Sequence, residues 1–154
     1  MVKIERVSFS QFRHIRPACL PDSQIDEYEE TSVLVTGWGL TGLGLSGTVA
    51  QSLQVQNVLI MQHRECQDIF KNSVTEQMIC IKGLGENIGS TCPGDSGSGI
   101  MKLVNGMYEV VGIVSWDTGN VGCQDRFPTV ATKVTSILEW IKGEISDSFQ
   151  CSIP

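Results

Sequence analysis

The 154-residue chain lacks an apolar run near the eighteen or so residues that a transmembrane helix needs, and Gln, Asn, Gly or Lys interrupts its longer apolar stretches. Residues 1–6 also lack the apolar segment and cleavage site of a secretion signal. Charge is scarce at 18%, and 17 Asp and Glu outnumber 11 Lys and Arg, which gives a net charge of −6. These features argue against nucleic acid and membranes as partners.

Metal-binding patterns are also lacking. No Cys-x-x-Cys pair occurs, and the only histidines are His14 and His63, so we expect no structural zinc, and nothing implies an organic cofactor. The six cysteines stand singly along the chain, at Cys19, Cys66, Cys80, Cys92, Cys123 and Cys151. An even number of dispersed cysteines favours disulfides and an oxidising compartment over buried free thiols, but composition does not choose among the possible pairings.

Short apolar segments between turn residues predict an antiparallel β fold. Strands are expected at 32–38, 52–60, 77–82, 99–104 and 107–116, and a short helix at 62–71. In the second strand Leu53 and Val55 alternate with Gln54 and Gln56, the period-two pattern of a sheet with one wet face. The dipeptide Asn105-Gly106 predicts a tight hairpin between the last two strands.

The last part of the chain shows the periodicity of a helix instead of that of a strand. Apolar residues at spacings of three and four predict a helix with one apolar stripe, formed by Val134, Ile137, Leu138, Ile141 and Ile145. Ser136 and Glu139 fit a capping box. Many short strands and one terminal helix predict an all-β domain, an antiparallel barrel or sandwich with an appended helix.

The segment Thr91-Cys92-Pro93-Gly94-Asp95-Ser96-Gly97 carries the most chemistry. Ser96 lies between glycines, which allow a substrate to approach its hydroxyl, although serine is a poor nucleophile unless activated. Gly94 and Gly97 permit the backbone to bend so that neighbouring N–H groups converge, as an oxyanion hole requires. Taken alone, such a run of turn residues is more often an ordinary surface loop.

Further motifs follow one another along the chain in a fixed order. They are Ile15-Arg16-Pro17-Ala18-Cys19-Leu20-Pro21, Val35-Thr36-Gly37-Trp38-Gly39, Met78-Ile79-Cys80, Gly94-Asp95-Ser96-Gly97, Ile113-Val114-Ser115-Trp116 and Trp140-Ile141. In this order the chain resembles the trypsin-like serine proteases of the chymotrypsin family, from about Val2 to Ile141.

The resemblance implies a fold of two antiparallel β-barrels with the active site between them. This chain would supply the C-terminal part of such a domain over residues 1–145. Its expected parts are a first-barrel remnant and connection (1–31), the second barrel (32–133), the C-terminal helix (134–145) and a tail (146–154).

The resemblance also implies a serine-type endopeptidase that acts on protein or peptide substrates. Ser96 matches the nucleophile, and the N–H groups of Gly94 and Ser96 match the oxyanion hole of the family's serine triad. Asp95 matches the buried carboxylate that pairs with a new amino terminus after zymogen cleavage.

Substrate-binding residues are implied in the same way. Ser115, Trp116 and Asp117 match the strand segment that aligns a substrate peptide. Ser90 stands where an aspartate gives trypsins their preference for basic residues, and Asp117 and Thr129 stand at wall positions that are commonly glycine. We expect a narrow pocket for small or medium apolar side chains, with attraction of a basic side chain by Asp117 as the alternative.

Two disulfides are implied by the family, Cys66–Cys80 and Cys92–Cys123. Cys19 matches the cysteine that tethers a catalytic domain to a propeptide or light chain, so its partner is expected outside this sequence. For Cys151 three outcomes stay open: a bond to Cys19, a bond to another chain, or a free thiol. The disulfides and the resemblance together predict an extracellular protein.

The family's base lies in an Ala-Ala-His-Cys motif that this sequence lacks, and its catalytic aspartate precedes the segment matched by Val2-Lys3-Ile4. His14 and His63 match neither position. Loss of the base costs on the order of a millionfold in turnover, so we expect this chain alone to be a nearly inert fragment of a protease. The alternatives are a non-catalytic homologue that binds partners through the substrate cleft, and a disulfide-stabilised structural domain.

Overall fold

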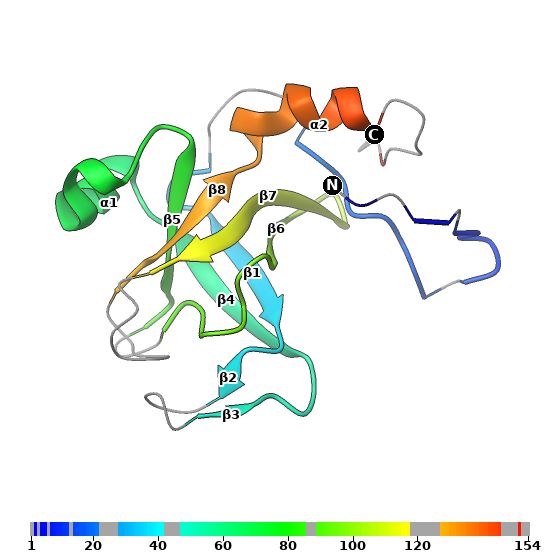
Figure 1. Ribbon diagram of the computed structural model, residues 1–154, viewed down its shortest axis with the longest axis horizontal. Coiled ribbons are helices and arrows are strands. Elements are labelled where there is room, and N and C mark those ends of the chain that lie inside the picture. Colours follow the sequence, from blue (N-terminus) through cyan, green and yellow to red (C-terminus); the bar gives the residue numbers. More distant parts are fainter. Residues whose placement is uncertain are drawn as a thin grey trace.

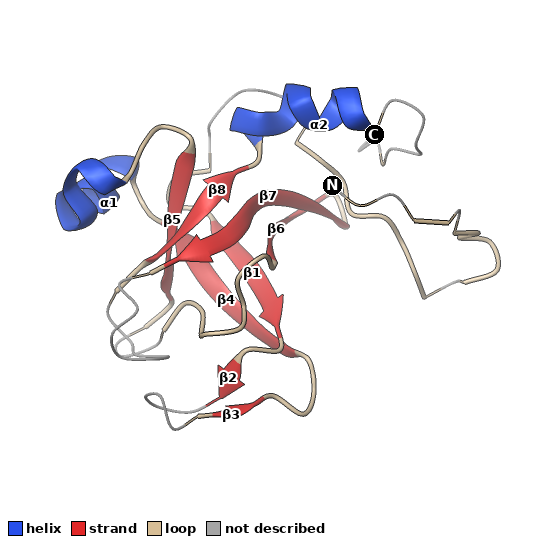
Figure 2. Cartoon of the chain, in the orientation of Figure 1, coloured by secondary structure: helices blue, strands red, loops and turns tan. Residues whose placement is uncertain are grey.

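Six antiparallel strands close into a barrel in the order β1-β4-β5-β8-β7-β6 (Figures 1 and 2). The computed structural model describes residues 2, 4–5, 7–12, 14–21, 28–41, 47–85, 89–117, 127–145 and 151. The barrel strands are β1 (Ser32–Gly37), β4 (Gln54–Ile60), β5 (Met78–Gly83), β6 (Gly99–Val104), β7 (Met107–Trp116) and β8 (Thr129–Lys133). The predicted all-β barrel with a C-terminal helix is confirmed.

Strand β8 was missed by the sequence patterns because both of its faces are covered. Four of its five residues are buried. Ala131 faces the barrel interior, and Val130 faces an outer cluster. A strand buried on both faces shows no period-two alternation, which is the signal used to find strands.

The barrel interior holds the main core. Its buried members come from all six strands and from the segment before β1, and they are Tyr28, Val33, Val35, Val58, Ile60, Ile79, Ile81, Ile100, Val111, Val114 and Ala131. In β1, β4 and β5 alternate residues supply these side chains, because successive side chains point to opposite faces.

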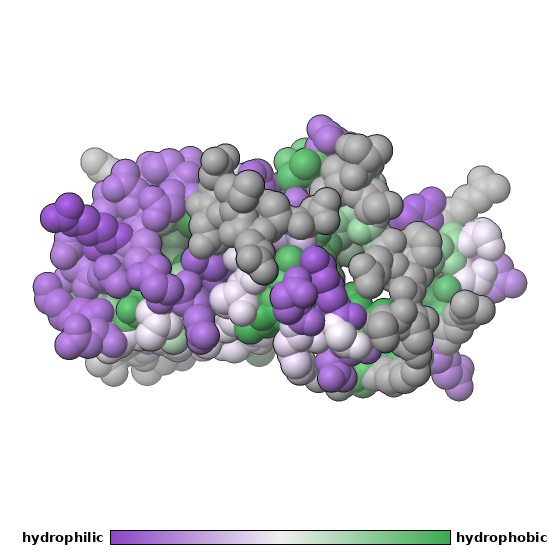
Figure 3. Space-filling view, turned by 90° about the horizontal axis from the view of Figure 1, so that it is seen from above, coloured by the Kyte–Doolittle hydropathy of each residue, from purple (hydrophilic) through white to green (hydrophobic). Residues whose placement is uncertain are grey.

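A second cluster packs on the outside of the barrel under helix α1 (His63–Phe70), which is followed by the 3-10 turn η1 (Lys71–Ser73). The Cys66–Cys80 disulfide lies in this cluster and ties α1 to β5, as the resemblance implies. Figure 3 shows that the surface at the α1 end of the molecule is mainly hydrophilic.

The one wet face expected for the second strand holds only in part: Gln54 is exposed as the alternation implies, but Leu53 and Val55 are more than half exposed as well. Val58 and Ile60 are buried in the interior, so Gln54 and Gln56 share their face, and Val55 on the opposite face is 64% exposed. Val58 and Ile60, at the end of β4, set the register of the strand, because a one-residue shift would turn both side chains out of the barrel interior. The alternation over residues 53–56 therefore points its apolar side outward.

The hairpin between β6 and β7 is confirmed. Asn105 and Gly106 have φ values of 50° and 81°, the left-handed pair that a type I′ turn requires. The segment between β1 and β4 carries two short paired strands, β2 (Leu40–Thr41) and β3 (Thr48–Val49).

The C-terminal helix forms, but its start differs from the prediction. Residues Thr135–Ile137 make a 3-10 turn, η2, and helix α2 spans Leu138–Glu144. The capping box is wrong, because Ser136 lies inside the 3-10 turn and its hydroxyl donates to the Lys133 carbonyl at 2.6 Å. No described helix is long and apolar enough to cross a membrane.

The segment before the barrel is joined to β7 at Cys19. The Cys19 N–H donates to the Tyr108 carbonyl at 2.8 Å, and the Val110 N–H donates to the Cys19 carbonyl at 2.9 Å. Cys19 forms a disulfide with Cys151, so the expected partner outside this sequence is wrong, and one of the outcomes left open for Cys151 holds. The physical reason is that Cys151 lies beside the start of β7, where its Sγ is 4.0 Å from Met107 Sδ.

We expect Ile100→Ala to lower the free energy of unfolding by about 2–5 kcal/mol, because Ile100 is fully buried in the barrel core at the β1–β6 seam. The matched control is Leu103→Ala on the same strand, which removes a side chain that is 59% exposed. Its expected effect is below about 1 kcal/mol. Denaturant unfolding measures both values, and equal losses would contradict the assignment of Ile100 to the core.

Candidate active site

A tight turn opens the segment that carries Ser96. The Asp95 N–H donates to the Cys92 carbonyl at 3.0 Å, and Gly94 at the third position of this turn has a φ of +99°. A negative φ at Pro93 followed by a positive φ defines a type II turn, which needs glycine at its third position. Proline at the second position presets the turn.

A second type II turn follows at once and presents Ser96. The Ser98 N–H donates to the Asp95 carbonyl at 3.0 Å, and Gly97 has a φ of +88°. The Gly97 N–H donates to the Val114 carbonyl at 2.8 Å, and the Val114 N–H donates to the Ser98 carbonyl at 2.9 Å. These two bonds dock the turn on β7 and leave Ser96 exposed at its outer corner.

The N–H groups of this segment fall into two sets. Those of Asp95, Gly97 and Ser98 all donate hydrogen bonds within the segment or to β7. Those of Gly94 and Ser96 donate none to any described residue. Within residues 94–98, the two donors that the resemblance assigns to an oxyanion hole are therefore the two that have no described acceptor.

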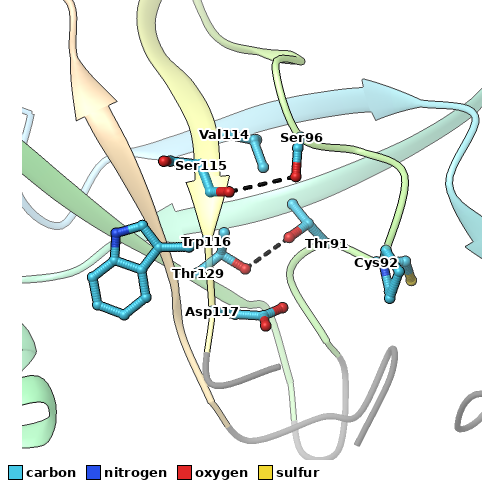
Figure 4. Close-up of a pocket in the computed structure, with 9 residues that line it drawn as sticks. Thr91, Cys92, Ser96, Val114, Ser115, Trp116, Asp117 and Thr129 are labelled. Atoms are coloured by element: carbon cyan, nitrogen blue, oxygen red, sulfur yellow. Dashed lines mark hydrogen bonds between the residues drawn. The ribbon is translucent and has the colours of Figure 1, made fainter. Parts of the chain in front are cut away.

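The Ser96 hydroxyl faces a cavity and holds only a weak contact. Its Oγ donates to the Ser115 carbonyl at 3.4 Å (Figure 4), which is long for such a bond. Neither histidine lines this cavity. His63 Nε2 lies 3.1 Å from Glu76 Oε1 beside helix α1, and His14 lies in the segment before the barrel.

The cavity has a volume of about 170 Å³ and opens beside Ser96. Its walls come from the turn segment, the end of β7 and the start of β8, and its lining residues are Thr91, Cys92, Pro93, Ser96, Val114, Ser115, Trp116, Asp117 and Thr129. Within the described ranges, no group of three His, Cys, Asp or Glu residues is placed to hold a metal ion.

Thr129 closes the floor of the cavity. Its side chain is 2% exposed, and its Oγ1 lies 2.7 Å from both Ser90 Oγ and Thr91 Oγ1 (the second contact is drawn in Figure 4). Ser90 is 5% exposed and does not line the cavity. The structure therefore places Ser90 behind Thr129 and not on the cavity surface, and it adds Thr91, which sequence comparison did not single out.

The end of β7 offers a strand edge next to Ser96. Pairing with the β6 side is described only as far as Val114, whereas Trp116 pairs with Val130 of β8 across a bulge at Ser115. The indole of Trp116 points away from Ser96 (Figure 4) and packs edge-to-face on Phe70, with ring centroids 5.2 Å apart. An edge of this kind can add an extended peptide by backbone hydrogen bonds.

The Asp95 carboxylate is held by backbone N–H groups. Gly39 N–H donates to Oδ1 at 2.8 Å, and Cys92 N–H donates to Oδ2 at 2.9 Å. Asp95 is half-buried, and no Lys, Arg or His in the described ranges pairs with it. The contact of Gly39 with Asp95 was not predicted from the sequence, although the pair of glycines around Trp38 was the available signal.

Cys92, beside the cavity, is disulfide-bonded. Its expected partner, Cys123, lies outside the described residues. The remaining substrate-binding position, Asp117, is half-buried in the cavity wall at the end of β7.

The antiparallel barrel and the serine turn beside an open strand edge define a domain of the serine protease class. The family model described as Trypsin matches residues 1–141. The match covers most of the chain, and the chain belongs to the trypsin family.

We expect Thr129→Val to lower the free energy of unfolding by about 1–3 kcal/mol, because it leaves the buried Ser90 hydroxyl without its partner. The matched control is Thr132→Val on the same strand, whose hydroxyl makes no hydrogen bond to a described residue. Thermal or denaturant unfolding of both variants checks this, and a loss no larger than that of the control would contradict the floor network.

Proposed function

We propose that this protein is a serine-type endopeptidase in which Ser96 is the nucleophile and the N–H groups of Gly94 and Ser96 form the oxyanion hole. One observation carries the proposal: the exposed Ser96 lies at a cavity rim, and neither its own N–H nor that of Gly94 donates a hydrogen bond to a described residue. Membership of the trypsin family supports the same assignment.

The reaction follows from this arrangement. Ser96 Oγ attacks the carbonyl carbon of the scissile peptide, and its proton passes to a base. The carbonyl oxygen becomes an oxyanion that accepts hydrogen bonds from Gly94 and Ser96. The proton then moves to the leaving amine, the C–N bond breaks, and water releases the acyl group from Ser96 by the same steps. We propose that the base and the carboxylate that orients it come from a part of the protein outside this sequence.

The substrate's position follows from β7. We propose that the peptide lies along the open edge at Ser115, Trp116 and Asp117, as an added strand. The side chain before the scissile bond then enters the cavity, whose floor is an uncharged threonine hydroxyl. A volume of about 170 Å³ fits a small or medium apolar side chain. Attraction of a basic side chain by Asp117 is the alternative.

We also propose an extracellular location. Every described cysteine is disulfide-bonded, and disulfides persist in oxidising compartments. The trypsin family assignment agrees with this location.

A fluorophosphonate probe tests the nucleophile, because only an activated serine reacts quickly with it. We expect the full-length protein isolated from its source to be labelled at Ser96, and the Ser96→Ala variant to resist labelling. The recombinant 154-residue chain, in which neither histidine lines the cavity at Ser96, should react slower by on the order of a millionfold.

Two outcomes of this labelling would contradict the proposal. Equally fast labelling of the 154-residue chain would show that no outside base is needed. A folded full-length protein that resists the probe would instead be the non-catalytic homologue.

A library of peptide substrates tests the pocket. We expect the full-length enzyme to cleave after Ala or Val with a kcat/KM at least about tenfold above that after Arg or Lys. Thr129→Gly removes the floor side chain and should move the preference toward larger apolar residues, whereas Thr132→Gly on the same strand should leave it unchanged. A strong preference for Arg or Lys would overturn the apolar assignment in favour of Asp117.

A further inference from the structure

Three hydroxyl groups form a series of contacts that ends at the cavity wall. Ser90 Oγ lies 2.7 Å from Thr129 Oγ1, which in turn lies 2.7 Å from Thr91 Oγ1. Ser90 is 5% exposed and Thr129 is 2% exposed, whereas Thr91 is half-buried and lines the cavity. The series therefore runs from the protein interior to the cavity, with Thr91 as its outer member. We call these three side chains the hydroxyl network.

The hydroxyl network has one more hydrogen than its own contacts use. Each hydroxyl group carries one hydrogen that it can donate, and its oxygen can accept two hydrogen bonds. The three groups therefore bring three hydrogens to two contacts. No described residue accepts a further hydrogen bond from any of them. One hydroxyl hydrogen is thus left for water or for a bound molecule.

Burial decides which hydroxyl group carries the spare hydrogen. On Ser90 or Thr129 it would lie in the interior without an acceptor, and a buried donor without a partner is destabilising. The arrangement that avoids this has Ser90 donating to Thr129 and Thr129 donating to Thr91. The Thr91 hydrogen is then free to be donated into the cavity. Hydrogen bonds in such a series polarise one another, which strengthens the last donor.

We infer that Thr91 is a specificity-determining residue, because its hydroxyl group donates a hydrogen bond to the side chain that the cavity holds. The inference deepens the proposed function and rests on it for the claim that this side chain belongs to a peptide substrate. The substrate class is a peptide with a small, neutral, oxygen-bearing side chain before the scissile bond. Among the amino acids, threonine and serine carry such a side chain.

Size and charge both limit the side chain that can reach Thr91. The cavity of about 170 Å³ takes a side chain no larger than the small and medium ones considered above. Among its described lining residues there is no Lys, Arg or His, and one of them is Asp117. A substrate carboxylate would therefore enter without a cation to pair with it, which is costly. Figure 4 shows the Thr91–Thr129 contact between Ser96 and Asp117.

Threonine and valine side chains have nearly the same shape, so a comparison of the two separates the hydrogen bond from the size. Solvent can accept the Thr91 hydrogen while the cavity is open. A bound valine displaces that solvent without replacing its hydrogen bond, whereas a threonine hydroxyl accepts from Thr91 in its place. The preference for small side chains over Arg and Lys is kept, and threonine is preferred to valine within it.

Peptide binding tests the inference without a catalytic readout. The full-length protein carrying Ser96→Ala is titrated by calorimetry with two acetylated peptides, Ala-Ala-Ala-Thr-Ala-Ala and Ala-Ala-Ala-Val-Ala-Ala. We expect the threonine peptide to bind at least about fivefold more tightly than the valine peptide. Equal affinities, tighter binding of the valine peptide, or no binding of either peptide would overturn the inference.

Variants of Thr91 in the same Ser96→Ala protein show whether this residue is the donor. Thr91→Val removes the hydroxyl group at nearly constant shape, so the ratio of the two affinities should fall to about one. Thr91→Ser keeps a hydroxyl group and should keep the preference for threonine. Thr132→Val is the matched control, because the Thr132 hydroxyl makes no hydrogen bond to a described residue, and it should leave the ratio unchanged.

A folded Thr91→Val variant that still prefers the threonine peptide would overturn the inference. If that variant fails to fold, Thr91→Ser takes its place, and loss of the preference in the folded Thr91→Ser variant would contradict the donor role.

These outcomes are separate from those of the proposed function. Peptide binding reports the chemistry of the cavity wall, and the fluorophosphonate probe reports whether Ser96 is activated. A preference for the threonine peptide in a protein that resists the probe would reject the peptidase and keep the donor role of Thr91. Labelling of Ser96 together with equal peptide affinities would keep the peptidase and reject that role.

Discussion

The active-site geometry depends on how the Asp95 carboxylate is held. Its two oxygens accept hydrogen bonds from the end of the β1 segment and from the start of the serine turn, at 2.8 and 2.9 Å. The side chain therefore fastens two consecutive type II turns to the barrel. Without that link, the positive φ values at Gly94 and Gly97 would be local preferences of a surface loop with no fixed direction for their N–H groups.

The barrel supplies a second constraint, the free edge of β7. Docking of the turn at Gly97 and Val114 ends the pairing on one side of β7, and the bulge at Ser115 separates the remaining edge from the β8 register. The position of Ser96 and the end of the described β6–β7 pairing are thus set by the same pair of hydrogen bonds. On the outer surface of the domain, the apolar side chains of Trp38, Leu53 and Val55 are more than half exposed. The domain therefore has apolar side chains exposed on its surface.

Local patterns in the sequence were enough to predict the antiparallel β class, the Asn105-Gly106 hairpin and the bend at Ser96, because each depends on residues adjacent in the chain. The choice of a barrel over a sandwich came from the family resemblance. Tertiary contacts decided the rest. Strand β8 is buried on both faces, Val55 faces outward because Val58 and Ile60 set the register, and Ser136 bonds to Lys133 instead of capping a helix. The placement of Ser90 behind Thr129 and the bond of Cys19 to Cys151 likewise join residues far apart in sequence.

In the proposed reaction, the oxyanion accepts hydrogen bonds from the N–H groups of Gly94 and Ser96. The most direct measurement is a crystal structure of the full-length protein with a peptidyl boronate bound. The account predicts a bond from boron to Ser96 Oγ, with one boronate oxygen about 2.7–3.1 Å from both the Gly94 and the Ser96 nitrogen. An adduct whose oxygens avoid those two nitrogens, or an unmodified Ser96 beside a bound ligand, would contradict it.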